Sequence, residues 1–121
     1  MRNQPLTTTP GTIPASEAWP LDDLIKFTDG GIASRVLAKN GGGNLTLFAF
    51  DQGQGLSEHT TPFDALVLVL EGELSLTIGG TAVTATPGTI VRMPANVPHA
   101  VDATVASRML LIMLREPKPA A

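Results

Sequence analysis

Short hydrophobic runs separated by Gly, Pro, Asn or Asp make up most of the chain after residue 30. The runs recur at intervals of about 8 to 12 residues, a spacing typical of an all-β sandwich or barrel. A helical turn or two is expected before them, because Pro20 can occupy a first helical position and Leu21, Leu24 and Ile25 share one helical face. The pattern predicts strands at residues 32–39, 45–50, 65–70, 74–78, 81–86, 89–93 and 109–114.

The last of these strands, residues 109–114, is apolar at every position, whereas residues 74–78 alternate between apolar and polar side chains. One face of residues 109–114 can line a barrel, but the other face needs cover as well. A second copy of the chain is the expected cover, because a monomer would expose a large apolar patch. The sequence therefore predicts a homodimer; the alternative is that an N-terminal arm covers this face within one chain.

The length of 121 residues suits one domain that can bury a core without a disulfide or a structural metal. Hydrophobic residues make up 43% of the chain and charged residues 16%, which indicates a globular protein. We expect a single barrel domain at residues 17–116. The Thr- and Pro-rich residues 1–16 are expected to form a flexible or extended arm, and residues 117–121 a loose tail.

The charge and the absence of cysteine exclude several classes of function. The net charge is -3 without any cluster of Lys or Arg, so neither nucleic acid nor an anionic membrane is an expected partner. Zero cysteines exclude disulfides, thiolate metal sites and a cysteine nucleophile. The apolar runs are far shorter than the roughly 20 residues that cross a bilayer, and the first residues lack the apolar stretch of a secretory signal. We expect a cytoplasmic protein.

The two histidines, His59 and His99, each lie at the entrance of a predicted strand, next to a bend rich in Gly or Pro. Residues 53–72 form the first histidine segment, and residues 88–99 form the second. Imidazole is a common ligand for Zn, Fe, Ni and Mn, so two histidines on separate strands can supply half of a metal site. We expect a pocket between the two histidine segments.

These two segments resemble the paired motifs of the cupin family, G-x5-H-x-H-x(3,4)-E-x6-G and G-x5-P-x-G-x2-H-x3-N. The resemblance covers residues 40 to 115, and the spacing between the two motifs is normal for the family. It implies a double-stranded β-helix, or jelly-roll barrel, that is usually dimeric and often holds a divalent metal through three histidines and a glutamate. The matching positions are Gly53, His59 and Gly72 in the first motif and Gly88, Pro94 and His99 in the second.

Four positions depart from the motifs. Thr61 and Ala65 stand where the second histidine and the glutamate are usual, and Asn96 and Ala103 stand where glycine and asparagine are usual. Of the four ligands that the resemblance implies, only the two histidines remain. They can hold a divalent ion such as Zn, Mn, Fe or Ni only weakly, because water or substrate must replace each missing ligand. The alternative is a metal-free pocket in which the histidines orient an organic ligand.

Two functions therefore stay open. The first is a barrel that binds a small molecule, with or without a weakly held divalent metal at His59 and His99, and without strong catalysis. The second is a metal-dependent oxygenase, isomerase or lyase that acts on a small polar or aromatic compound. No residue is assigned a catalytic role, and the side chains expected to line the pocket beside the histidines are Thr61, Ala65, Val67, Met93 and Met113.

Overall fold

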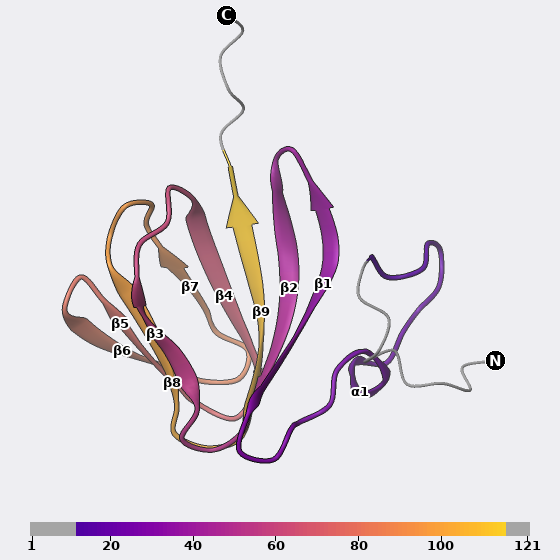
Figure 1. Cartoon of the computed structure of the whole chain (residues 1–121), viewed down its shortest axis with the longest axis horizontal. Helices are drawn as coiled ribbons and strands as arrows, with labels where there is room; N and C mark the ends of the chain where they lie inside the picture. The colour runs from indigo at the N-terminus through magenta and orange to yellow at the C-terminus, as the bar shows by residue number, and fades with distance from the viewer. Residues whose placement is uncertain (1–11, 116–121) are drawn as a thin grey trace, which may run out of the picture.

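The chain folds into two antiparallel β-sheets that face each other, as the computed structural model of residues 12–115 shows (Figure 1). The strands are β1 (Ile32–Asn40), β2 (Gly43–Phe50), β3 (Gly55–His59), β4 (Asp64–Glu71), β5 (Leu74–Ile78), β6 (Thr81–Ala85), β7 (Ile90–Met93), β8 (His99–Ala103) and β9 (Ser107–Leu114). One sheet has the order β1-β2-β9-β4-β7 and the other β3-β8-β5-β6. The sheets approach each other at the lower end of Figure 1 and separate at the upper end. The predicted all-β jelly-roll barrel is confirmed.

All seven predicted strands are present, with ends that shift by at most two residues. The hydrophobic pattern gave no bounds for β3 or β8, because β3 carries mostly exposed polar side chains and the polar residues His99 and Asp102 interrupt the apolar residues of β8; the start of β8 at His99 agrees with the strand entrance expected there. The short helix α1 (Leu21–Leu24) is also present, but Pro20 precedes it in an extended conformation instead of occupying its first position. Leu24 is buried, whereas Leu21 is exposed, so the predicted helical face is only partly covered.

The main core lies between the two sheets. Alternation along β4 sends Ala65, Val67 and Val69 inward, where all three are buried. The intervening leucines of β4 point to the outer face of the five-stranded sheet and are partly buried. The uninterrupted apolar run of this strand therefore supplies apolar side chains to both faces of its sheet, one buried in the core and the other partly covered.

A second, smaller core covers part of that outer face. Its cover is the N-terminal segment, which we define as residues 12–27 and which lies beside β1 and β2 in Figure 1. Leu24 and Ile25 pack there against Leu47 and Ala49, and the backbone N–H of Ile13 donates to the carbonyl of Leu37 at 3.0 Å. The rest of the predicted arm (residues 1–11) and the predicted tail (117–121) lie outside the described residues.

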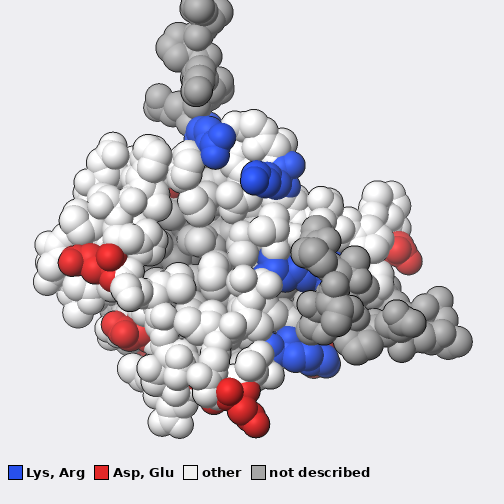
Figure 2. Space-filling view, in the orientation of Figure 1, with Lys and Arg blue, Asp and Glu red and all other residues white. Residues whose placement is uncertain are grey.

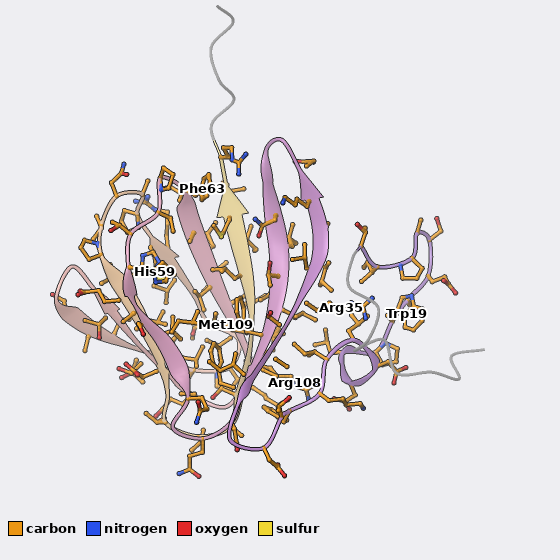
Figure 3. All side chains as sticks on the ribbon, in the orientation of Figure 1. Trp19, Arg35, His59, Phe63, Arg108 and Met109 are labelled. Atoms are coloured by element: carbon orange, nitrogen blue, oxygen red, sulfur yellow. The ribbon has the colours of Figure 1, made fainter. Side chains whose placement is uncertain are left out.

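Arg108 of β9 fastens the N-terminal segment to the barrel. Its guanidinium lies 2.7 Å from the carboxylate of Asp22 in α1, also pairs with Glu71 of β4, and lies 5.3 Å from the ring centre of Phe27. Burial opposes the positive charge, but the hydrogen bonds with Asp22 and Glu71 outweigh it and raise the pKa of Arg108. Figure 3 shows Arg108 on the side of the barrel that faces α1.

The outer face of the five-stranded sheet is only partly covered by the described residues. Side chains of paired residues on antiparallel strands share one face, and the register places six apolar residues together beyond the N-terminal segment. We call them the open apolar face: Leu45, Leu66, Leu68, Ile90, Ile112 and Leu114. Ile90 is 56% exposed and Leu114 51% exposed. Within residues 12–115, α1 has four residues, and no helix is long and apolar enough to cross a membrane.

Candidate functional site

A cavity of about 60 Å³ lies between the two sheets. Its wall contains both histidines, three of the four methionines of the chain, Thr61 and several aliphatic side chains. Figure 2 shows a hollow between the sheets that is bordered mainly by uncharged side chains. The complete wall consists of Leu56, His59, Thr61, Ala65, Met93, His99, Val101, Met109, Leu111 and Met113.

The pairing of β3 with β8 places the two histidines side by side. His59 and His99 are partners in this ladder, and their ring centroids lie 4.5 Å apart at an interplanar angle of 69°. His99 is 4% exposed, whereas His59 is exposed at the rim. Figure 3 shows His59 on the β3 side of the space between the sheets.

The backbone determines which nitrogen of each ring carries the proton. His59 Nδ1 lies 2.8 Å from the carbonyl oxygen of Ser57, and His99 Nδ1 lies 3.2 Å from that of Val97. Because a carbonyl oxygen can only accept, each Nδ1 donates its proton. In the neutral rings the lone pair therefore belongs to Nε2, which is available to a ligand.

The opposite wall of the cavity comes from the five-stranded sheet. Ala65 of β4 pairs with Met93 of β7 on one side and with Met113 of β9 on the other, so the three side chains form one row. Met109 lies four residues before Met113 on β9, about 13 Å along the strand, and is fully buried. Figure 3 shows Met109 toward the narrow end of the barrel, away from the level of His59.

The structure places four of the five predicted pocket-lining residues, all except Val67, in the cavity wall. Val67 lies two positions further along β4, where it is fully buried in the core instead. Four further wall residues were not predicted from the sequence: Leu56, Val101, Met109 and Leu111. Alternation could have found three of them, because Val101 shares a face with His99, and Met109 and Leu111 share a face with Met113.

The two histidine segments also meet through their backbones. The N–H of Asn96 donates to the carbonyl of Thr61 at 2.8 Å. Asn96 has a φ of 65°, a conformation that asparagine tolerates better than most residues, which explains why it can replace the usual glycine. Gly72 has a φ of 82°, and a Cβ there would lie 2.2 Å from Ser107 Oγ. This close approach requires glycine at the end of the first segment.

The side chains around the histidines do not fit the divalent ion that the four-ligand motif implies. Among residues 12–115, no group of three or more His, Cys, Asp or Glu side chains could hold a metal. Thr61 directs its hydroxyl to the carbonyl of Phe63 at 3.3 Å. Asp64, which is adjacent in sequence to the lost glutamate position at Ala65, instead accepts from the N–H of Ala95 at 2.9 Å and lies 3.6 Å from Arg92. Two neutral imidazoles remain, half of the implied ligand set.

Comparison with known proteins decides the family. The family model described as a cupin domain matches residues 46–114, more than half of the chain. The chain belongs to the cupin family. This cupin matches none of the curated proteins.

Solved structures of other cupins agree with this assignment. A conserved protein of unknown function from Streptococcus pyogenes is 31% identical, with a TM-score of 0.81 over 92% of this chain and 95% of that one. A cupin superfamily protein from Desulfitobacterium hafniense is 28% identical, with a TM-score of 0.80 over 88% of this chain and 97% of that one. A cupin 2 conserved barrel domain protein from Leptotrichia buccalis is 34% identical, with a TM-score of 0.76 over 80% of this chain and 47% of that one.

Proposed function

We propose that this cupin binds a small organic molecule in the cavity between its two sheets and does not catalyse a demanding reaction. The observation that carries the proposal is the composition of the cavity wall: two adjacent imidazoles and Thr61 line an otherwise apolar enclosure. A mostly apolar enclosure with a few convergent polar groups is the usual form of a small-molecule site. In this wall no carboxylate stands beside either histidine as an orienting partner for general base catalysis.

The chemistry of the wall narrows the ligand. The Nε2 lone pairs of His59 and His99 accept hydrogen bonds, and the methionines and leucines of the wall offer apolar contact. A small, mostly apolar molecule with one hydroxyl group satisfies both parts. Because the cavity volume is about 60 Å³, only a few non-hydrogen atoms of the ligand can lie inside the cavity.

A metal-dependent oxygenase, isomerase or lyase is the second candidate. The available Nε2 atoms of the two histidines favour it, because both are free of the backbone contacts that occupy Nδ1. The missing carboxylate and third histidine oppose it, since each lost ligand weakens retention of a divalent ion. Elemental analysis of untagged protein and of the His59→Ala, His99→Ala double variant separates the two candidates.

The assembly that we propose is a homodimer formed through the open apolar face. The six apolar side chains of this face form one contiguous patch, whereas monomeric proteins usually expose hydrophobic residues singly and far apart. Light scattering at micromolar concentration should give twice the mass of one chain, and an Ile90→Asp variant should give the mass of a single chain. A single-chain mass for the unaltered protein would contradict the dimer. The cytoplasmic location stays a prediction.

The ligand proposal is tested by filling the cavity. Small alcohols and phenols are screened by thermal shift, and hits are measured by calorimetry against an Ala65→Leu variant, whose larger side chain enters the cavity. The matched control is Ala82→Leu, the same change at an exposed position of β6. Binding that survives in the control and disappears in Ala65→Leu supports the proposal. No hit in a broad screen, or equal binding by both variants, would overturn it.

A further inference from the structure

The three methionines that share the cavity with the histidines have no role in the proposed function beyond apolar contact. We propose that the cavity binds one soft monovalent metal ion, Cu(I), between the imidazoles of His59 and His99 and the thioethers of Met93 and Met113. This inference goes beyond the proposed function, because it names a metal ion as a ligand of the same cavity and requires no organic molecule.

The four side chains line one cavity, and the strand register sets their neighbours within each sheet. His59 and His99 pair with each other in the four-stranded sheet. In the facing sheet, Met93 and Met113 flank Ala65 on the two neighbouring strands, so their Cα atoms are about 10 Å apart. All four side chains line the same cavity. Because the side chain between the two methionines is only a methyl group, both flexible thioethers can turn toward the centre.

The chemistry of these donors matches Cu(I) better than a divalent ion. Thioethers are soft ligands that select Cu(I), and imidazole also binds copper. All four groups are neutral, so they cannot offset the charge of a buried divalent ion, whereas a monovalent ion loses less hydration on burial. An ion about 2 Å from each ring nitrogen can bridge two imidazoles whose centroids are 4.5 Å apart.

The departures from the four-ligand motif agree with this choice of ion. Ala65 stands at the glutamate position and Thr61 at a histidine position, so the hard carboxylate and one imidazole are absent. The two methionines on either side of Ala65 occupy the neighbourhood of the lost carboxylate. Where the motif implies ligands for a hard divalent ion, this cavity offers a mixed set of nitrogen and sulfur donors.

Methionine also fills irregular core space without binding anything. Met109 has that role, because it is fully buried near the narrow end, about 13 Å along the strand from Met113. It therefore provides a matched control within the same strand and the same cavity. If Met93 and Met113 were filler as well, exchanging either of them for leucine would change metal affinity no more than exchanging Met109.

The test is an anaerobic titration of the full chain with Cu(I) in competition with a chromophoric Cu(I) chelator, without any organic ligand. We expect one Cu(I) per chain and a sulfur neighbour in X-ray absorption. The Met93→Leu, Met113→Leu double variant should lose at least about tenfold in Cu(I) affinity, the lower end of what even outer-shell changes cost. Its affinity for Zn(II) should not change, and Met109→Leu should keep the Cu(I) affinity of the unaltered protein.

Three outcomes would overturn the proposal. The unaltered protein could bind Cu(I) no better than the His59→Ala, His99→Ala variant, or the methionine double variant could bind Cu(I) as tightly as the unaltered protein. The third outcome is that Met109→Leu loses as much Cu(I) affinity as the methionine double variant. Methionine to leucine changes conserve volume and cost less than about 1.5 kcal/mol, so the variants should fold. If the double variant unfolds, the single Met113→Leu change, at a partly exposed position, gives the same comparison. A negative Cu(I) titration does not affect the result of the organic ligand screen. A screen without hits likewise does not affect the result of the Cu(I) titration.

Discussion

His59 and His99 are direct partners in the ladder between β3 and β8, and their rings meet edge to face with centroids 4.5 Å apart. Each ring is held by a bond from its own Nδ1 to a carbonyl two residues earlier, not by a bond to the other ring. Either imidazole can therefore be removed without releasing the other. The pair is a fixed, two-point binding surface on one wall of the cavity.

The two histidines should differ in their effect on stability. His99 is 4% exposed, so His99→Ala is expected to lower the free energy of unfolding by about 1–3 kcal/mol. His59 is exposed at the rim, and His59→Ala should stay within about 0.5 kcal/mol. Urea unfolding followed by far-UV circular dichroism measures both. Equal losses in the two variants would show that exposure does not govern their contribution.

Gly72 should tolerate no side chain. Its φ of 82° strains any residue with a Cβ, and an added Cβ would also lie 2.4 Å from the carbonyl oxygen of Ala106. The matched control is Gly80→Ala in the β5–β6 hairpin, where φ is 85° but no atom lies within 4 Å of the added Cβ. We expect a loss of about 1–2 kcal/mol in Gly80→Ala from the backbone alone, and a larger loss in Gly72→Ala. Similar losses in chemical denaturation would exclude a contribution from the close approach.

Arg108 should control the attachment of the N-terminal segment. Arg108→Leu removes the ion pairs with Asp22 and Glu71, and we expect trypsin to cleave after Lys26 faster than in the unaltered protein. The control is Arg92→Leu, because Arg92 and Asp64 form an exposed pair at 3.6 Å that contributes little. Limited proteolysis followed by mass spectrometry measures the two rates. Unchanged cleavage in Arg108→Leu would show that apolar packing alone holds the segment.

Asp51 should make stability depend on acid pH. Its carboxylate accepts hydrogen bonds from the N–H groups of Gly30 and Gln52, which hold the pKa of Asp51 below its ordinary value of 3.8. A depressed folded-state pKa adds stability that is present above pH 3.8 and is lost as the pH falls through the folded-state value. The melting temperature of Asp51→Asn should therefore fall less on acidification than that of the unaltered protein. The exposed change Glu17→Gln is the control, and identical acid profiles for Asp51→Asn and the unaltered protein would contradict the expectation.

The fold was predictable because its signals are local. Turn glycines and regular apolar runs located seven of the nine strands in residues 12–115, and the motif spacing identified both histidine segments. The bounds of β3 and β8 were not predicted because exposed polar residues hide the hydrophobic pattern in β3, and His99 and Asp102 interrupt it in β8. Strand register across the sheet decides two further features. It places Val67 in the core instead of the cavity wall, and it places Ala65 between two methionines. Register arises from pairings between residues distant in sequence, so composition and spacing could not provide it.

The strand order has a consequence for how the protein folds during synthesis. β9 comes last among the described strands, yet it lies at the centre of its sheet, between β2 and β4. At synthesis rates of about 5 to 20 residues per second, β9 is made several seconds after β2 and β4. Until then, the edges of β2 and β4 that pair with β9 have no partner. During that interval the five-stranded sheet is incomplete, and its apolar strands are open to intermolecular pairing. The five-stranded sheet, and with it the barrel, therefore cannot be completed before β9 has been synthesised.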